Sequence, residues 1–191
     1  MKTFYIFLGV QGSGKSTIYR RVNKQVDLGE RINQDAIVKK YNLNDDSLRD
    51  VIMAASIIYD RLKVCSVGEK SFNYETTIPS NALFKFINIA KQNGFEVRVC
   101  WVYLHTLDEH LQRIQQRVQK GGHDVHTPFV VSNFQNRFKY IEKIIELCDE
   151  VSFFDNTERT LLTAKFENGE CVYKSDEKLP FESTLCEVIT K

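Results

Sequence analysis

The chain has 191 residues, 42% of them hydrophobic and 27% charged, which predicts one soluble globular domain with a full core. Its formal net charge of +1 gives no overall reason to expect binding to nucleic acid or acidic membranes, although a local basic groove stays open. The sequence has no apolar run of about 18 residues and begins directly with strand-like residues, so we expect neither a membrane span nor a signal peptide.

The five cysteines indicate a reducing compartment. They are odd in number and widely spaced, and no two of them form a C-x-x-C pair. A disulfide framework or a zinc site would show closer, paired spacing. We therefore expect a cytoplasmic protein with reduced thiols at Cys65, Cys100, Cys148, Cys171 and Cys186.

The first half of the chain alternates short apolar runs with helical patterns. Apolar runs predict strands at 4–8, 31–33 and 71–74. Apolar residues at helical spacing predict helices at 15–24, 47–62 and 80–92, and Asn93-Gly94 closes the last of these. In the helix over 47–62, the residues expected on one apolar face are Leu48, Val51, Ile52, Ala55, Ile58 and Leu62.

The second half continues the alternation. The clearest strand is expected at 96–104, and the helix that follows it shows Leu107, Leu111, Ile114 and Val118 at three- and four-residue spacing before Gly121-Gly122 stops it. Thr127 and Pro128 are a good cap and first-turn pair for a long helix that ends near Cys148. The last core strand is expected at 151–154. Beyond it, Asn168-Gly169 predicts a hairpin between 164–167 and 171–173, followed by a short final helix.

This order of elements predicts the fold class. Strands that alternate with helices imply a parallel sheet covered on both faces. We expect residues 1–191 to form a single three-layer α/β domain, with a small β-hairpin and helix at about 161–191.

A glycine-rich turn between the first strand and the first helix has the Walker A pattern. The segment reads Gly9-Val10-Gln11-Gly12-Ser13-Gly14-Lys15-Ser16. Its backbone N–H groups at a helix amino terminus predict a polyphosphate site, where Lys15 contacts the β- and γ-phosphates and the Ser16 hydroxyl takes one Mg²⁺ coordination position. We expect ATP and Mg²⁺ as cofactors, with ATP contacts from Gly9, Gln11, Gly12, Ser13, Gly14, Lys15, Ser16 and Thr17.

Acidic and hydroxyl side chains follow the second and third predicted strands. Ligands of open α/β sheets bind at this edge, so Asp35 could accept a proton from a hydroxyl that attacks the γ-phosphate. Its alternative role is the N-cap of a helix over 36–41. Glu75 could hold a substrate hydroxyl or order a metal-bound water, with Thr76 and Thr77 as small polar contacts. Alternatively, Thr77 and Ser80 only cap the next helix.

Two arginines four residues apart precede the Gly121-Gly122 pair. Arg113 and Arg117 share one helix face and could close over the γ-phosphate, where phosphoryl transfer requires cations. The alternative is a solvated face near a helix carboxyl terminus, where basic residues are favoured. His123 and His126 fit polar loop residues better than a metal site, since no cysteine or second histidine pair lies nearby.

Together these segments resemble the zeta-toxin-like kinases of the P-loop superfamily. The resemblance covers roughly residues 4 to 175. The segments that carry it occur in a fixed order, which is Gly12-Ser13-Gly14-Lys15-Ser16-Thr17, Asn33-Gln34-Asp35, Glu75-Thr76-Thr77, Arg117-Val118 through Gly121-Gly122-His123-Asp124-Val125, and Phe154-Asp155-Asn156-Thr157. It implies the fold of nucleoside monophosphate kinases and, as in the founding members, transfer of phosphate from ATP to the amino sugar of UDP-N-acetylglucosamine.

The resemblance also implies roles for single residues. Asp35 matches the general base, Lys15 the phosphate lysine, and Arg113 and Arg117 the lid arginines, in a lid region at about 113–137. Glu75 and Thr77 match the sugar-nucleotide contacts. An antitoxin-type protein partner is implied in the same way.

The sequence departs from the family in the lid. Relatives commonly have proline where this chain has His126, and the proline here comes later, at Pro128. Many relatives carry an arginine and an aromatic residue where this chain has Asn133-Phe134. Arg137, one turn on, is the candidate to replace that arginine.

Two other functions are weighed against this one. Polynucleotide kinases of the same superfamily would phosphorylate a 5′-hydroxyl, but a polynucleotide acceptor needs several phosphate contacts, and basic residues here are interspersed with acids. A regulatory or ABC-type ATPase is disfavoured because the sequence has no run of four apolar residues ending in Asp and no Leu-Ser-Gly-Gly signature. We therefore expect a small hydroxyl-bearing metabolite as substrate, such as a nucleotide sugar, and no nucleic-acid or membrane partner.

Overall fold

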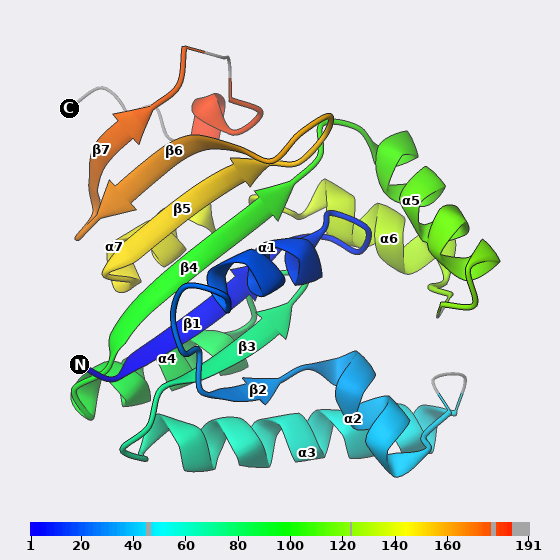
Figure 1. Ribbon diagram of the computed structural model, residues 1–191, viewed down its shortest axis with the longest axis horizontal. Helices are drawn as coiled ribbons and strands as arrows, with labels where there is room; N and C mark the ends of the chain where they lie inside the picture. Colours follow the sequence, from blue (N-terminus) through cyan, green and yellow to red (C-terminus); the bar gives the residue numbers. More distant parts are fainter. Residues whose placement is uncertain (45–46, 123, 177–178, 185–191) are drawn as a thin grey trace.

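The computed structural model describes residues 1–44, 47–122, 124–176 and 179–184. Within these residues, seven strands form one sheet in the order β2-β3-β1-β4-β5-β6-β7 (Figure 1). The strands are β1 (Thr3–Leu8), β2 (Glu30–Ile32), β3 (Phe72–Thr76), β4 (Glu96–Tyr103), β5 (Glu150–Asp155), β6 (Leu161–Glu167) and β7 (Glu170–Lys174). The first five are parallel, whereas β6 and β7 continue the sheet as an antiparallel hairpin. The predicted parallel sheet with a hairpin is therefore confirmed.

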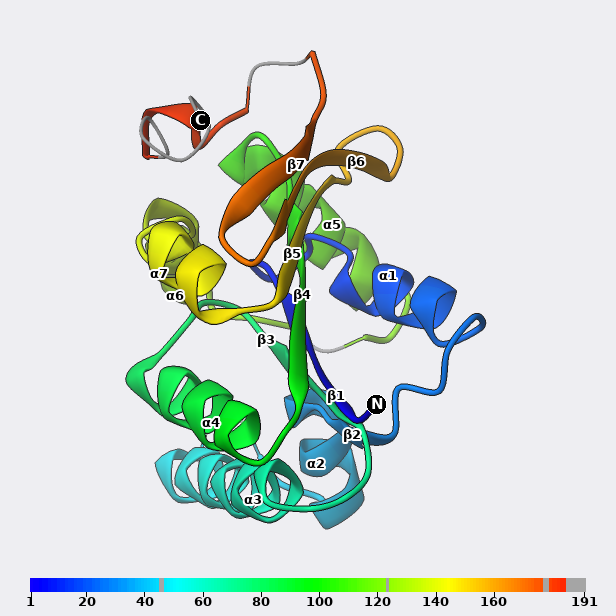
Figure 2. The same cartoon turned by 90° about the vertical axis from the view of Figure 1, so that its left-hand side faces the viewer.

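Helices cover both faces of this sheet. They are α1 (Lys15–Val22), α2 (Gln34–Tyr41), α3 (Leu48–Ser66), α4 (Asn81–Gln92), α5 (Leu107–Gln119), α6 (Thr127–Gln135) and α7 (Ile141–Leu147), and a short 3₁₀ turn spans Glu182–Thr184. Figure 2 shows α1 on one side of the sheet and α4 and α7 on the other, which is the expected three-layer arrangement. Among the described residues, no helix is long and apolar enough to cross a membrane.

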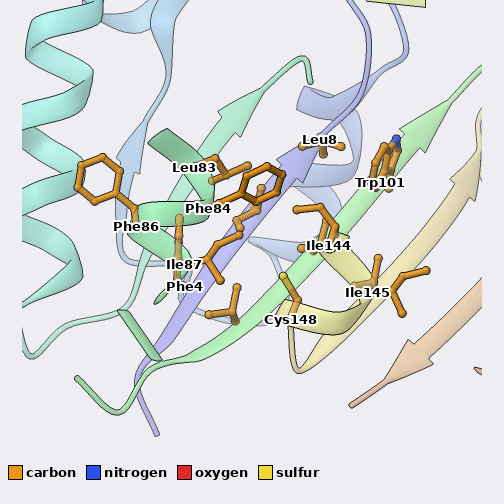
Figure 3. Packing of buried hydrophobic residues seen from close by; sticks show 14 of the residues in the cluster. Phe4, Leu8, Leu83, Phe84, Phe86, Ile87, Trp101, Ile144, Ile145 and Cys148 are labelled. Atoms are coloured by element: carbon orange, nitrogen blue, oxygen red, sulfur yellow. The ribbon is translucent and has the colours of Figure 1, made fainter. Parts of the chain in front are cut away.

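The core explains why the central strands are apolar throughout. Alternate residues of β1 point to opposite faces. Phe4, Ile6 and Leu8 join the larger cluster with α4 and α7, while Phe7 packs against Ile18 of α1. Figure 3 shows the larger cluster, with side chains of α4 and α7 meeting those of β1 and β4. Since both faces are covered, both sets of residues are buried.

The predicted apolar face of the helix over 47–62 is wrong in its first half. The buried residues of α3 are Ala54, Ile58, Leu62 and Ser66, at four-residue spacing. Leu48 is 76% exposed and Val51 37% exposed, and Ile52 and Ala55 are exposed as well. The first turns of α3 extend past the end of β2, so no strand covers them there (Figure 1).

The long helix predicted over 127–148 is two helices, α6 and α7, with a turn at 136–140. Asn136 ends α6, and its side-chain amide donates to Ser132 O at 2.8 Å. The turn places Phe138 against Trp101 and Phe181, so burial of this ring favours the break. Thr127 is not the N-cap of α6, because that position belongs to His126, which makes no side-chain capping bond.

The predicted hairpin is present near the end of the described chain. Asn168 and Gly169 both have positive φ, 51° and 86°, as a tight hairpin turn between β6 and β7 requires. The predicted final helix appears only as the 3₁₀ turn, and residues 185–191 lie outside the described residues. Four cysteines have free thiols, and Cys186 also lies outside the described part of the chain.

Candidate functional site

The glycine-rich loop joins β1 to α1 and passes very close to neighbouring backbone. Gly9, Gly12 and Gly14 have positive φ values of 150°, 79° and 98°. A Cβ on Gly9 would lie 2.1 Å from Val102 O, and one on Gly14 would lie 2.2 Å from Asn156 Nδ2. Only glycine permits both this conformation and this approach. The loop leads into the first turn of α1, where Thr17 N and Ile18 N donate to Gly14 O at 2.9 and 3.3 Å and the N–H groups before them have no acceptor within the helix.

Lys15 lies in the loop with only 8% of its surface exposed. Its Nζ donates to Gly9 O at 2.6 Å and to Val10 O at 3.3 Å. Burial lowers the pKa of Lys15, Glu75 and Asp35 oppose that change by their negative charges, and Arg117 adds to it. The charges that act on Lys15 thus belong to three residues that the sequence placed in the site.

These residues line one cleft of about 1250 Å³ at the carboxyl edge of the parallel strands. Its walls come from the glycine-rich loop, the starts of α2 and α3, the end of β3, α5, α6 and the segment 124–126. The predicted site residues that line it are Gln11, Gly12, Gly14, Lys15, Ser16, Asp35, Glu75, Thr76, Thr77, Arg113 and Arg117. Gly9 and Ser13 are buried within the loop and Thr17 is half-buried on α1, and none of the three lines the cleft.

Asp35 is in the first turn of α2, but it does not cap this helix. The N-cap is Asn33, whose Oδ1 accepts a hydrogen bond from Ala36 N at 2.9 Å. The capping alternative for Asp35 is therefore wrong. Its carboxylate is exposed at the cleft, in the first turn of α2.

Glu75 is held more firmly than the sequence indicated. Its carboxylate accepts hydrogen bonds from Ser16 Oγ at 3.1 Å, Arg31 Nη2 at 3.0 Å and Asn33 Nδ2 at 2.9 Å, and its side chain is 11% exposed. Sequence reasoning missed Arg31 and Asn33 as partners. The strand register brings them together, because Ile32 of β2 pairs with Tyr74 of β3 and so puts the next residues side by side.

The threonines after Glu75 have separate roles. Thr76 Oγ1 lies 3.5 Å from Ile78 O. Ser80 caps α4 by accepting from Leu83 N at 3.3 Å, so the capping alternative holds for Ser80 and not for Thr77. Thr77 is half-buried and lines the cleft.

The two arginines of α5 differ in their surroundings. Arg113 Nη2 donates to Asn156 O and Thr157 O, both at 2.6 Å, so it is attached to the loop after β5. Arg117 Nε and Nη2 are buried and have no hydrogen-bond partner among the described residues. Leaving two such donors unpaired is unfavourable, and an anion in the cleft would satisfy them.

Arg137 does not take the place of the missing lid arginine. Its guanidinium stacks on Phe134 at 3.6 Å and Phe138 at 4.9 Å, and it donates to Phe134 O at 2.5 Å. Asn133, where the resemblance led us to expect an arginine, lines the cleft and donates to Gln11 Oε1 at 3.1 Å.

His110 is a further residue at the loop that sequence reasoning missed. It is completely buried on α5, and its Nδ1 lies 2.7 Å from Gln11 O. Burial lowers the pKa of His110 to about 4, so the neutral ring donates its Nδ1–H to this carbonyl. Its position three residues after Leu107 and four before Ile114 was a signal, since all three share one face.

The residues beside the loop fit Mg²⁺. Mg²⁺ prefers oxygen ligands and usually takes one or two from the protein and the rest from water and phosphates. The Ser16 hydroxyl donates its proton to Glu75, which leaves its oxygen lone pairs for a cation. No group of three or more metal-ligating side chains occurs in the described part of the chain, and His123 lies outside it.

The chain matches one family model and one related protein in sequence. Residues 5–139 match the model of a family described as AAA domain (AAA_33). An uncharacterized protein of Haemophilus influenzae is 30% identical over 120 residues, which cover 61% of this chain and 81% of that protein. Because the match to the family model spans more than half of the chain, it decides the family.

Solved structures share the fold at lower identity. The complex of AvrRxo1-ORF1 and -ORF2 with ATP has a TM-score of 0.67 and 17% identity, covering 98% of this chain. This chain spans only 63% of that one. A structure from the PezAT chromosomal toxin–antitoxin system of Streptococcus pneumoniae has a TM-score of 0.54 and 19% identity, covering 98% of this chain and 78% of that one. These likenesses confirm the predicted fold class.

Proposed function

The chain belongs to the AAA domain family, and from this membership and the cleft we propose that it is an ATP-dependent kinase. It transfers the γ-phosphate to a hydroxyl group of a small metabolite. The observation that carries the proposal is the set of charges at one end of the cleft. Lys15 and the unpaired nitrogens of Arg117 supply positive charge there, and Asp35 supplies an exposed carboxylate that caps no helix.

The positive groups bind and orient the triphosphate. The N–H groups at the start of α1 contact its oxygens, and Lys15 exchanges its two carbonyl acceptors for phosphate oxygens. Arg117 gains the partners that it lacks among the described residues. Ser16 Oγ, beside Glu75, would hold Mg²⁺, and the ion would supply compensation of phosphate charge when bound. Phosphoryl transfer requires mainly such positioning and charge compensation.

Asp35 serves as the general base. It lies on the helix that follows β2, on the cleft wall next to the loop, and no capping bond holds its carboxylate. It accepts the proton of the acceptor hydroxyl as this oxygen attacks the γ-phosphorus, and the bond from the γ-phosphorus to the β,γ-bridging oxygen breaks to release ADP. A base in this position contributes ~10²–10⁴-fold to the rate.

We propose a nucleotide sugar, such as UDP-N-acetylglucosamine, as the acceptor. Beyond Asp35 the cleft has apolar walls, where Leu48 and Val51 of α3 and Phe129 of α6 are exposed. Apolar side chains in a cleft suit a planar base or another apolar part of a ligand. Thr77 offers a hydroxyl for the sugar, and Glu75, which accepts hydrogen bonds from Ser16, Arg31 and Asn33, offers its remaining acceptor positions.

An antitoxin-type protein partner and a cytoplasmic location are part of the same proposal. Two of the similar structures are described as AvrRxo1-ORF1 with -ORF2 and as a toxin–antitoxin system. The free thiols agree with a reducing compartment. A second protein that binds this chain one to one and stops its phosphate transfer would support the proposed partner. If this chain is harmless when it is expressed alone in its native host, that result would argue against an antitoxin-type partner.

One experiment tests the proposed reaction. The protein is incubated with Mg²⁺, γ-labelled ATP and separate panels of UDP-sugars, nucleosides and 5′-hydroxyl oligonucleotides, and the label is followed by mass. We expect label on a UDP-sugar. Label on oligonucleotides alone would replace the acceptor by a polynucleotide, and label released only to water would contradict a kinase.

A further inference from the structure

A row of hydrogen bonds connects the glycine-rich loop to the helix that carries Asp35. Ser16 Oγ donates to Glu75 Oε1 at 3.1 Å, and Asn33 Nδ2 donates to Glu75 Oε2 at 2.9 Å. The other end of the same amide, Asn33 Oδ1, accepts from Ala36 N at 2.9 Å. Three segments that are distant in the sequence thus meet through one carboxylate and one amide.

Asn33 is fixed in this place by both of its amide atoms. The residue is only 7% exposed and follows β2 directly. Its side-chain nitrogen donates to Glu75 of β3 and its side-chain oxygen accepts from Ala36 of α2. A 180° flip of the amide would exchange donor and acceptor and so break both hydrogen bonds. Asp35 lies two residues further along, in the helical turn that this amide holds.

Arg31 supports the same carboxylate from the other side. Its Nη2 donates to Glu75 Oε2 at 3.0 Å, and its guanidinium lies 4.1 Å from the ring centre of Tyr19 on α1. The charge of Glu75 is therefore compensated, and its position is tied to both α1 and β2. A charged hydrogen-bonded group of this kind gives the row a rigid centre.

We propose that Asn33 is a positioning residue for phosphate transfer, which holds Asp35 in register with Ser16 through Glu75. This inference rests on the proposed function, because it assigns Asp35 to the reaction. Asn33 borders the cleft, but its amide nitrogen donates to Glu75 and its amide oxygen accepts from Ala36 N, so we assign it a positioning role rather than a contact with ATP or the acceptor. Its effect is geometric, since a displacement of about 1 Å at a reacting group can cost about 10²-fold in rate.

Asn33→Ser removes the hydrogen bond to Glu75 while keeping an oxygen that can accept from Ala36 N. Serine is as good an N-cap as asparagine, but its hydroxyl is too short to reach Glu75 while capping. The matched control is Asn93→Ser, because Asn93 is exposed at the end of α4 and its Nδ2 donates only locally, to Ile89 O at 2.8 Å. We expect the melting temperatures of both variants to stay close to that of the unaltered protein.

The kinetics of Asn33→Ser distinguish a residue that positions Asp35 from one that only stabilises the fold. With Mg²⁺–ATP and the acceptor found in the panel, Asn33→Ser is expected to lower kcat by about 10–100-fold and to leave the KM for ATP nearly unchanged. In an Asp35→Asn background, the same change is expected to have less than about a threefold effect, because the group that it positions is gone. Full activity of Asn33→Ser, or an equal loss in both backgrounds, would overturn the proposal.

Amide hydrogen exchange gives a readout that needs no turnover. Exchange in residues 34–38 is expected to be at least about fivefold faster in Asn33→Ser than in Asn93→Ser, because the first turn of α2 loses its tie to β3. Unchanged exchange there would overturn the proposal whether or not the protein is active. If no acceptor in the panel takes label, the proposed function fails, and the exchange result alone then decides whether Asn33 holds this turn.

Discussion

His110 makes the stability of the protein depend on pH. Its ring is completely buried, and its pKa falls from 6.5 to about 4 on folding, mainly because burial disfavours the charged ring. Above pH 6.5 the ring is neutral in both states and contributes no pH dependence. Between 6.5 and about 4 the unfolded chain binds a proton that the folded chain does not, so stability falls as the pH is lowered.

The size of this effect follows from the change in pKa. At 1.36 kcal/mol for each pKa unit, the difference between 6.5 and about 4 corresponds to about 3 kcal/mol in the free energy of unfolding. His110→Gln removes the titration but keeps an N–H that can donate to Gln11 O. We expect the variant to be less stable than the unaltered protein at about pH 7, and this deficit to shrink by about 3 kcal/mol at about pH 4.

Urea unfolding at several pH values between these limits measures the effect. His126→Gln is the matched control, because it makes the same substitution at an exposed residue of the cleft rim. A stability difference between His110→Gln and the unaltered protein that stays constant over this range would refute the reasoning. It would mean that the buried ring takes up its proton as readily as the unfolded chain does.

Three further predictions concern the cleft. Lys15→Met should weaken ATP binding by about 10–100-fold in calorimetry, because a hydrogen bond to a charged group contributes about 1.5–3 kcal/mol, and unchanged affinity in a folded variant would count against the Walker A assignment. Hydrogen exchange in residues 113–122 and 124–127 should slow when a non-hydrolysable ATP analogue and acceptor bind, whereas equal rates would mean that these residues do not form a lid. Phe129→Ser should raise the KM for the acceptor several-fold with the KM for ATP unchanged, and a rise in both would place Phe129 outside an acceptor pocket.

Local patterns were sufficient to predict the glycine-rich loop and the strands of the central sheet. The glycine-rich loop is readable because positive φ angles demand glycine, and the strands are readable because both faces of the sheet are apolar. These features need no knowledge of distant parts of the chain. The fold class, the hairpin and the loop between β1 and α1 were therefore predictable.

The rest depends on contacts between distant segments. The turn between α6 and α7 lets Phe138 pack against Trp101 and Phe181, which lie far away in the sequence. The partners of Glu75 follow from the register of β2 and β3, which no local pattern specifies.

The face of α3 was mispredicted for a related reason. Leu48 and Val51 continue the apolar pattern of the helix, but the sheet does not extend beneath them and they line the cleft instead. An apolar residue at helical spacing can face a ligand as readily as a core. Sequence alone does not distinguish these two surroundings.

The most direct test of the central claim compares ATP binding and phosphate transfer in Asp35→Asn. We expect turnover to fall by ~10²–10⁴-fold and the dissociation constant for Mg²⁺–ATP to change by no more than about twofold. The melting temperature should hardly change, because Asn33 caps α2 and Asp35 does not. A folded Asp35→Asn protein that transfers phosphate at the original rate would contradict the assignment of this cleft as a kinase active site with Asp35 as its base.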